Sequence, residues 1–255
     1  MNEAAGGVQS VQRALGLLKL LSLSEFGCRV SDLAREAGLP VSTTHRLLTT
    51  LELEGFASFD PSCFRWHVGR ESYSVGATYA QRFNFVASAL PHLKRLRDET
   101  RETVNLGILD GDELVTLTRV DSREIVRAIS REGGRTPVFC SGMGKAILAT
   151  WPDAHIAQLA NRAGFRPLTR RSHRTLDVFM RDISQVRSLG FATDDEEHEI
   201  GTRCVAAAFR SANGDAIGAI SVSAASSRFC HERMAEVGAV LSRVAATISL
   251  GGSAS

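Results

Sequence analysis

The sequence predicts an α+β protein in which a winged helix-turn-helix precedes a larger domain of helices and a mostly antiparallel sheet. Three observations lead to this prediction. Apolar residues recur at helical spacing through the first 53 residues, two short alternating segments follow around an Asp-Pro-Ser turn, and helical and strand-like patterns are mixed from residue 85 onward. We expect a winged helix-turn-helix over residues 1–71, a linker helix over residues 72–84 and an α+β domain over residues 85–255.

Length and composition narrow the class of protein. A chain of 255 residues suffices for two modest domains, and 44% hydrophobic with 23% charged residues is typical of a globular chain. No run of 18 apolar residues offers a membrane span, and the polar start MNEAAGGVQS is not typical of a signal peptide. The cysteines are odd in number and include no CxxC pair, which favours a reduced, cytoplasmic protein. They are Cys28, Cys63, Cys140, Cys204 and Cys230.

Two helices are expected to open the first domain. Leucines at helical spacing predict a helix over Val11–Leu23, for which Ser10 is placed as the N-cap. A shorter helix is expected over Asp32–Ala37, with Ser31 as its N-cap. Gly38 can then adopt the left-handed conformation that ends a helix.

A third helix is expected over Pro40–Leu53, because proline suits the first turn of a helix. Its surface divides into two faces. The apolar positions that face inward are Val41, Leu48 and Leu51, with Leu47 beside them. The other face carries short hydroxyls and one arginine, namely Ser42, Thr43, Arg46, Thr49 and Thr50, with His45 at its margin.

A β-hairpin is expected directly after this helix, because segments 56–59 and 64–68 alternate in polarity around the turn 60–62. Three helices followed by a hairpin describe a winged helix-turn-helix, whose recognition helix enters the major groove of DNA. Short hydroxyls and an arginine can reach phosphates and base edges there. We therefore predict binding to double-stranded operator DNA; the alternative is a solvated helix face in a small domain. The predicted contact residues are Ser42, Thr43, His45, Arg46 and Thr49.

Net charge does not identify the partner. The chain carries a formal charge of +2, and its first 80 residues contain seven basic and eight acidic residues. The most basic stretch, with five arginines, lies at residues 162–174. One weakly charged domain gains little from non-specific attraction to DNA, so two or more copies must add their contacts. This predicts that two or more copies bind together to a near-palindromic operator.

The larger domain is expected to mix helices and strands. A helix is expected over Pro91–Arg101, and Asp110-Gly111 is typical of the tight turn in a hairpin. The strands of that hairpin are Thr103–Leu109 and Glu113–Val120. Further strands are expected over Ile125–Ser130, Cys204–Arg210 and Ile217–Ala224, with an amphipathic helix over Met234–Leu250.

The run Ser141-Gly142-Met143-Gly144-Lys145 is compatible with three kinds of site. It lacks the GxxxxGK[ST] spacing of a phosphate loop. Ser141 and Lys145 are four residues apart and could form a nucleophile and its base on one helix face. Alternatively, a glycine-rich turn opens a helix over Lys145–Ala149, and its backbone N–H groups hold a small anion or a carbonyl without catalysis.

No metal site is expected. His198-Glu199 begins like the zinc motif HExxH, but Thr202 stands where the second histidine belongs, and Cys230-His231 has no spaced partner. The other cysteines are isolated and are expected to act as small hydrophobic residues.

Ser221 and Ser223 alternate with apolar neighbours, so both hydroxyls point to one face of a strand. That face could meet solvent or a polar pocket. Spacing alone does not bring these serines together with Cys204 or Asp194.

Two blocks resemble the IclR family of transcriptional regulators, over nearly the whole chain. SVQRALGLLKLL and SDLAREAGLPVSTTHRLLTTLELEGF are similar to the winged-helix domain of that family. PVFCSGMGKAILA and SLGFATDDEEHEIGTRCVAAAFRSANGDAIGAISVSAASSRF are similar to its effector-binding domain. The pattern DEEHEIG…C…AISVS with SSRF most resembles the allantoin-utilisation repressors, whose reported effector is glyoxylate.

The resemblance implies a GAF-like effector domain, a dimer that often pairs into a tetramer, and a small carboxylate effector. In such repressors the effector is held by backbone amides of the glycine-rich turn and by Asp, Cys and two Ser side chains. The matching positions are Gly142, Met143, Asp194, Cys204, Ser221 and Ser223. The chain departs from the usual family residues at Met143, Arg101 and Trp66. We expect no cofactor and no membrane partner.

These patterns favour a ligand-responsive DNA-binding regulator that acts as a repressor and has no enzymatic activity. Two alternatives stay open. One is an α+β hydrolase that uses Ser141 and Lys145, which would leave the Arg46 face without a role. The other is a thiol-redox regulator that uses Cys63 or Cys204, which would need a low thiol pKa.

Overall fold

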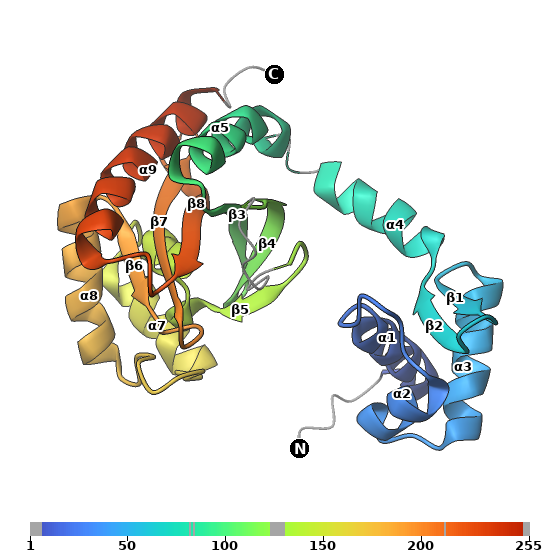
Figure 1. Cartoon of the computed structure of the whole chain (residues 1–255). Coiled ribbons are helices and arrows are strands. Elements are labelled where there is room, and N and C mark those ends of the chain that lie inside the picture. Colours follow the sequence, from blue (N-terminus) through green and yellow to red (C-terminus); the bar gives the residue numbers. More distant parts are fainter. Residues whose placement is uncertain (1–6, 82, 84, 123–130, 212, 252–255) are drawn as a thin grey trace. The chain divides into compact units, whose positions relative to one another are not determined.

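The computed structural model describes residues 7–81, 83, 85–122, 131–211 and 213–251 (Figure 1). Contacts divide the chain into two compact units, residues 1–83 and residues 84–255. Within the described ranges, no helix combines the length and the apolar character that crossing a membrane requires.

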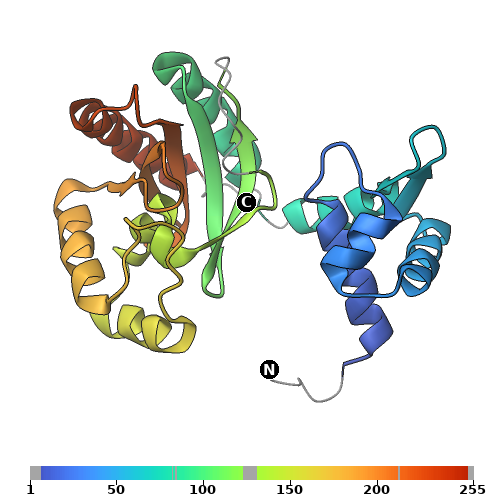
Figure 2. The same cartoon turned by 60° about the horizontal axis from the view of Figure 1, so that its bottom comes forward.

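The smaller unit is a winged helix-turn-helix (Figure 2). Its elements are α1 (Gln9–Leu21), α2 (Val30–Ala37), α3 (Val41–Leu53), the antiparallel hairpin of β1 (Ala57–Asp60) and β2 (Arg65–Val68), and α4 (Arg70–Gln81). Helices and hairpin close around a core that includes Leu17, Leu33, Leu48 and Trp66. Cys28 exchanges two backbone hydrogen bonds with Trp66 and so extends the hairpin by a short third segment. The predicted hairpin is confirmed.

Both α1 and α2 begin two residues earlier than predicted. Ser10 and Ser31 therefore lie inside the first turn, and neither helix has a side-chain hydrogen bond at its N-cap. Val30 packs against the core of the unit, and this tertiary contact favours the earlier start of α2 over the capping preference of serine. Gly38 ends α2 in the left-handed conformation, with φ of 63°, as predicted.

The prediction that Val41 on α3 faces inward is also wrong. Val41 is 52% exposed, because a matching angular position does not by itself bury a residue in the first turn of a helix. Thr44 is fully buried on this helix instead, and its Oγ1 donates to the carbonyl oxygen of Pro40 at 3.1 Å. The buried hydroxyl is thus satisfied within its own helix.

The helix α5 (Phe85–Thr100) runs through Pro91, whereas the sequence predicted a helix that begins there. An interior proline costs about 3 kcal/mol because it removes one backbone hydrogen bond and crowds the preceding turn. Leu93 and Leu96 are fully buried in the main core of the larger unit, and this packing outweighs the cost. Arg101, a position where the family usually has glycine, follows the helix with a left-handed φ of 61°.

The larger unit is built on one antiparallel sheet with the strand order β5-β4-β3-β8-β7-β6. Its strands are β3 (Thr103–Asp110), β4 (Glu113–Val120), β5 (Arg135–Pro137), β6 (Ala192–Asp195), β7 (Thr202–Arg210) and β8 (Ala216–Ala225). The predicted strands in β3, β4, β7 and β8 are confirmed, while the short edge strands β5 and β6 were not predicted. The predicted strand Ile125–Ser130 lies outside the described residues.

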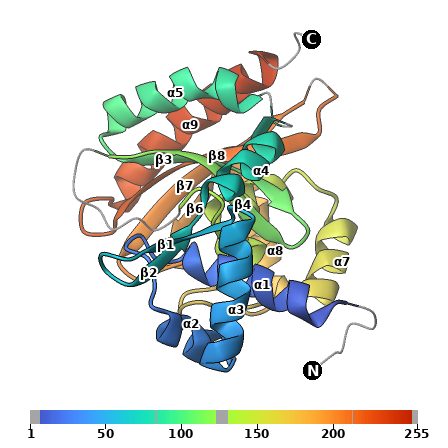
Figure 3. The same ribbon diagram turned by 90° about the vertical axis from the view of Figure 1, so that its right-hand side faces the viewer.

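Helices cover both faces of this sheet (Figure 3). The helices α5 and α9 (His231–Gly251) pack on one face, and α6 (Gly142–Leu148), α7 (Asp153–Ala163) and α8 (Leu176–Leu189) lie on the other side. Side chains alternate along each strand. On β8, Ile220 and Val222 enter the core under α5 and α9, whereas Ser221 and Ser223 face α6. This alternation turns polar side chains toward α6.

Candidate functional site

The predicted recognition face lies on α3. Ser42, His45 and Arg46 are exposed there, and Thr43 and Thr49 are half-buried on the same helix. Among the described residues, the guanidinium group of Arg46 makes no hydrogen bond or ion pair. It is therefore available to a phosphate or a base edge.

Contacts with the wing hold this face in place. The ring of His45 meets the ring of Trp66 on β2 edge-on, with centroids 6.1 Å apart. The Oγ1 of Thr49 donates to the carbonyl oxygen of His45 at 3.0 Å. The Thr49 hydroxyl thus serves its own helix and keeps only acceptor capacity for DNA.

The six residues predicted to hold an effector line one cavity of about 40 Å³ in the larger unit. They are Gly142 and Met143 on α6, Asp194 on β6, Cys204 on β7, and Ser221 and Ser223 on β8. The sequence analysis missed the other lining residues, which are Asn105, Leu114, Thr116, Thr136, Ser141, His198 and Thr202. Asn105 and Thr116 could have been found, because each is a polar residue among apolar neighbours in a predicted strand.

The register of the strands brings the polar side chains of the cavity together. Cys204 pairs with Asp194 on one side and with Ser223 on the other, and Asn105 pairs with Ser221. The Nδ2 of Asn105 donates to the Oγ of Ser221 at 3.4 Å and to the Oγ of Ser223 at 3.3 Å. Because both hydroxyls accept from Asn105, their own hydrogens can be directed to a ligand.

The N-terminus of α6 closes the cavity. Ser141 is the N-cap, and its Oγ accepts a hydrogen bond from the Gly144 N–H at 3.3 Å. A Cβ on Gly142 would lie 3.3 Å from the Cys204 Sγ and 3.5 Å from the Asp194 Cβ, so glycine allows the close approach of helix and sheet. The helix begins at Gly142, three residues earlier than predicted.

Asp194 is the acidic group of the cavity. Its Oδ1 accepts hydrogen bonds from the backbone N–H groups of Glu197 at 2.7 Å and His198 at 3.3 Å. Burial, followed by the charge of Glu197, raises the pKa of Asp194 to about 7. These surroundings favour the protonated carboxyl, which can donate as well as accept a hydrogen bond.

Cys204 stays protonated. Burial, followed by the negative charge of Asp194, raises the pKa of its thiol to about 12. A redox-active cysteine needs a low pKa, so this residue does not fit the redox alternative. Only Cys140 and Cys204 are buried as predicted for small hydrophobic residues; Cys28 and Cys63 are half-buried and Cys230 is exposed.

A buried ion cluster beneath the cavity was not predicted. Lys145 is fully buried, and its Nζ donates to the Asp182 Oδ2 and the Glu197 Oε1, both at 2.6 Å. His173 adds an Nε2 contact to Asp182 at 2.9 Å. A signal was present in the sequence, because Lys145 is the one charged residue in the helix GMGKAIL.

This cluster does not fit the hydrolase alternative. Burial lowers the pKa of Lys145, but the charges and hydrogen bonds of Glu197 and Asp182 outweigh it and hold the pKa above its usual value. A protonated Lys145 cannot take a proton from Ser141. The Ser141 Oγ is moreover engaged as the cap of α6.

The basic stretch at residues 162–174 is part of the larger unit, and two of its five arginines form ion pairs with acidic residues. Arg166 pairs with Asp112 at 2.6 Å, and Arg171 pairs with Asp195 at 2.7 Å. These arginines therefore stabilise loops of the effector domain.

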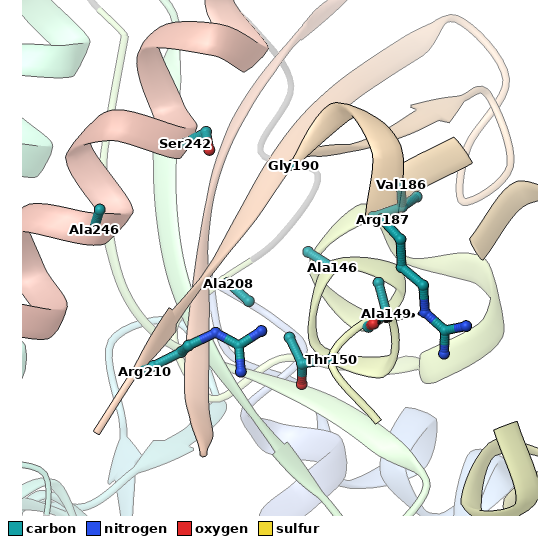
Figure 4. Close-up of a pocket in the computed structure, with 10 residues that line it drawn as sticks. All are labelled: Ala146, Ala149, Thr150, Val186, Arg187, Gly190, Ala208, Arg210, Ser242 and Ala246. Carbon is teal, nitrogen blue, oxygen red and sulfur yellow. Dashed lines mark hydrogen bonds between the residues drawn. The ribbon is translucent and has the colours of Figure 1, made fainter. Parts of the chain in front are cut away.

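A second cavity, of about 520 Å³, lies between α6, α8, α9 and β7 (Figure 4). Four of its ten lining residues are alanines, and none of the six predicted residues is among them. Arg187 at its edge donates to the carbonyl oxygens of Ala149 at 2.9 Å and Trp151 at 2.7 Å. The polar groups that suit a small carboxylate are gathered in the smaller cavity.

An exposed arginine-bearing helix beside a wing, joined in one chain to an α+β unit with a small polar cavity, defines a ligand-responsive DNA-binding regulator. Residues 10–61 match the family model of the IclR helix-turn-helix domain. Residues 77–250 match the model described as the bacterial transcriptional regulator IclR C-terminal domain. The chain belongs to the IclR family of transcriptional regulators.

Known relatives extend over nearly the whole chain. Transcriptional repressor IclR of Escherichia coli K12 is 35% identical over 249 residues, which cover 97% of this chain and 91% of the relative. The repressor AllR of the same strain is 32% identical over 246 residues, which cover 96% and 91%. The crystal structure of Thermotoga maritima IclR has a TM-score of 0.79 at 27% identity and covers 96% of this chain and 99% of that one. These similarities confirm the predicted fold class and the predicted class of transcriptional regulator.

The ion cluster predicts a large loss of stability when its cation is removed. Lys145→Met leaves the buried Glu197 and the half-buried Asp182 without their ammonium partner and with only the imidazole of His173 beside them. Breaking a buried pair costs about 3–5 kcal/mol. The free energy of unfolding, measured with urea, should fall by this amount. Adding Asp182→Asn and Glu197→Gln removes the unpaired charges and should recover most of the loss. A decrease below about 1 kcal/mol for the single variant would contradict the assigned role.

The raised pKa of Asp194 predicts a pH-dependent gain from Asp194→Asn. Between the unfolded pKa near 3.8 and the folded pKa of about 7, only the folded chain holds the proton, so the contribution of Asp194 to stability falls as pH rises. Asparagine cannot ionise, so the variant should gain stability relative to the parent between pH 5 and pH 8 in urea unfolding. Asp195→Asn is the control. Because the pKa of Asp195 is lowered, its contribution to the free energy of unfolding should be the same at pH 5 and at pH 8. A difference for Asp194→Asn that does not change with pH would refute the shift.

Proposed function

We propose that the chain is a repressor whose α3 helix binds operator DNA and whose 40 Å³ cavity binds a short oxo- or hydroxy-acid such as glyoxylate, which releases the operator. The observation that carries the effector proposal is the cavity itself. Residues from β3, α6, β6, β7 and β8 meet there, and they supply backbone amides, hydroxyls, a side-chain amide and one carboxyl group. We propose no catalytic step and no cofactor for this site, and we place the protein in the cytoplasm with its operator.

Exposure and charge support the DNA-binding part of the proposal. Arg46 projects from α3, and Ser42 and Thr43 at the start of the helix offer hydroxyls to phosphates. The first 80 residues carry no excess of basic over acidic residues, so one copy has little non-specific affinity. We therefore propose that a homodimer or homotetramer binds half-sites about one helical turn, or a multiple of it, apart.

The size of the cavity supports a short ligand. At about 40 Å³, the cavity has roughly a quarter of the volume of the ~150 Å³ cavity that accommodates benzene in another protein. An acid of two or three carbons matches this volume better than an aromatic acid does. Met143 and Leu114 close the apolar side of the cavity.

The polar groups suggest how a short oxo-acid is held. The backbone N–H groups of Gly142 and Met143 lie in the first turn of α6 and can donate to the carboxylate of the ligand. Ser221 and Ser223 can donate to the remaining oxygens. Asp194, when ionised, can accept from a hydroxyl of the hydrate and repels a second carboxylate, which selects against dicarboxylates.

Arg46→Ala tests the DNA-binding face. Loss of a base contact should weaken operator binding by about 1–3 kcal/mol and relax specificity at one position. Loss of a phosphate contact should instead weaken binding to all sequences and reduce the slope of log K against log salt by about one. Binding is measured by fluorescence anisotropy with operator and non-operator duplexes. Arg243→Ala, on the exposed surface of α9, is the control. Unchanged operator binding by a folded Arg46→Ala protein would refute the assignment.

The effector site is tested by operator release titrated with glyoxylate, pyruvate and succinate. The double variant Ser221→Ala with Ser223→Ala should lose the response because two ligand donors are gone, while it still binds the operator. Asp194→Ala should behave in the same way. Ser242→Ala, which lines the second cavity, is the matched control and should respond like the parent. A parental response from the double variant, or succinate as the best ligand, would show that the pocket is wrongly assigned.

A further inference from the structure

The wing carries a cluster of metal-ligating side chains that has no part in the proposed functions. Asp60, Cys63 and His67 each place one ligand atom within 4.8 Å of the other two. All three are half-buried. The sequence analysis treated Cys63 as isolated, but the hairpin brings it beside an acid and an imidazole.

The register of the hairpin explains this arrangement. Asp60 pairs with Arg65, and His67 pairs with Ser58, so Asp60 and His67 are diagonal neighbours on one face of the β-ribbon. The turn between the strands returns Cys63 toward that face, with Phe64 in a left-handed conformation at φ of 55°. Trp66 points to the opposite face and is buried in the core. The cluster therefore lies on the outer face of the wing.

The environment of the three groups suits a cation. Ser62 donates to Asp60 through its backbone N–H at 2.8 Å and its hydroxyl at 2.6 Å, and both hydrogen bonds end on Oδ1. The Oδ2 of the same carboxylate therefore remains for a ligand.

Gly27 leaves the space in which the imidazole ring of His67 lies. A Cβ at this position would lie 2.5 Å from the His67 Cε1 and 2.7 Å from the carbonyl oxygen of Trp66, so only glycine allows the ring to lie against the backbone here. Arg65 secures the same segment by donating to the carbonyl oxygen of Gly27 at 2.8 Å. The segment around Gly27 thus helps to position His67, one of the three metal-ligating side chains.

We propose that Asp60, Cys63 and His67 form a binding site for a divalent transition metal of the zinc type, with three protein ligands and a water in the fourth position. Thiolate, imidazole and carboxylate are the ligands that Zn²⁺ prefers, and this ligand number leaves one position open in a tetrahedral site. In a zinc site each ligand atom lies about 2.0–2.3 Å from the metal. To reach that geometry, the three ligand atoms need to move about 1 Å closer to one another. The hairpin turn, in which Cys63 lies, can supply this movement.

The other cluster of metal-ligating side chains within the described residues is not a candidate metal site. His173, Asp182 and Glu197 also lie within 4.8 Å of one another, but the Nζ of Lys145 already occupies the position between the two carboxylates. A buried ammonium group takes the place that a cation would need.

Metal binding changes the charge of the wing. The cation replaces the proton of the Cys63 thiol, which is released to solvent, so the wing gains one net positive charge. A winged helix places this hairpin near DNA, where a positive charge favours contact with phosphate.

Cobalt(II) tests the site directly, because it occupies zinc sites and reports its ligands by absorption. The full-length protein is reduced, treated with a chelator, desalted and titrated with cobalt(II) chloride. We expect one equivalent to produce a thiolate-to-cobalt charge-transfer band in the near ultraviolet together with visible bands of a tetrahedral site. Zinc chloride should then abolish both. No band at one equivalent would overturn the proposal.

Variants assign the ligands. Cys63→Ser should lose the charge-transfer band, whereas Cys230→Ser, which removes an exposed thiol outside the wing, should keep it. His67→Gln retains the thiol and should weaken cobalt binding at least about tenfold. A band that persists in Cys63→Ser, or an unchanged affinity in His67→Gln, would overturn the proposal. Neither result depends on the operator or the effector.

Discussion

The effector domain depends on one buried cation. The ammonium group of Lys145 is removed from water and compensated by Asp182 on α8 and by Glu197 after β6. Because an uncompensated charge in this position is so costly, the three segments must keep their relative positions. Glu197 also donates its backbone N–H to Asp194, and its charge helps to raise the pKa of that carboxyl group. The cluster thus connects the stability of α6 to the electrostatics of the cavity above it.

The sheet then separates two environments by simple alternation. Residues of β3, β7 and β8 that point to α5 and α9 are apolar and form the main core. Their neighbours in sequence point to α6, and among them are Asn105, Cys204, Ser221 and Ser223. Gly142 lets the start of α6 come within contact of these side chains, which leaves a volume of about 40 Å³. The same close packing that stabilises the domain therefore limits the space in this cavity to a few heavy atoms.

The winged unit shows why the position of charge matters more than its sum. Its basic and acidic residues nearly balance, yet Arg46 stands exposed on α3 without a partner among the described residues. Two arginines of the most basic stretch, Arg166 and Arg171, instead pair with acids of the larger unit. Trp66 connects the two parts of the DNA-binding surface, because it anchors the wing in the core and meets the ring of His45 on α3.

Local periodicity and contiguous motifs were sufficient to predict the two-domain organisation, the helix-turn-helix with its wing, four of the six strands described in the larger sheet, and the family. The sequence also supplied the six residues predicted to hold an effector, but only through the resemblance. Tertiary structure decided the rest. Pro91 lies within a helix because flanking leucines are buried, Val41 is exposed despite its periodicity, and Lys145 is a structural cation rather than a base. Asn105 joins the cavity, and Cys63 meets Asp60 and His67, only through strand register. Contacts between residues far apart in the chain, or across a turn, depend on how strands pair, and local sequence patterns do not encode that pairing.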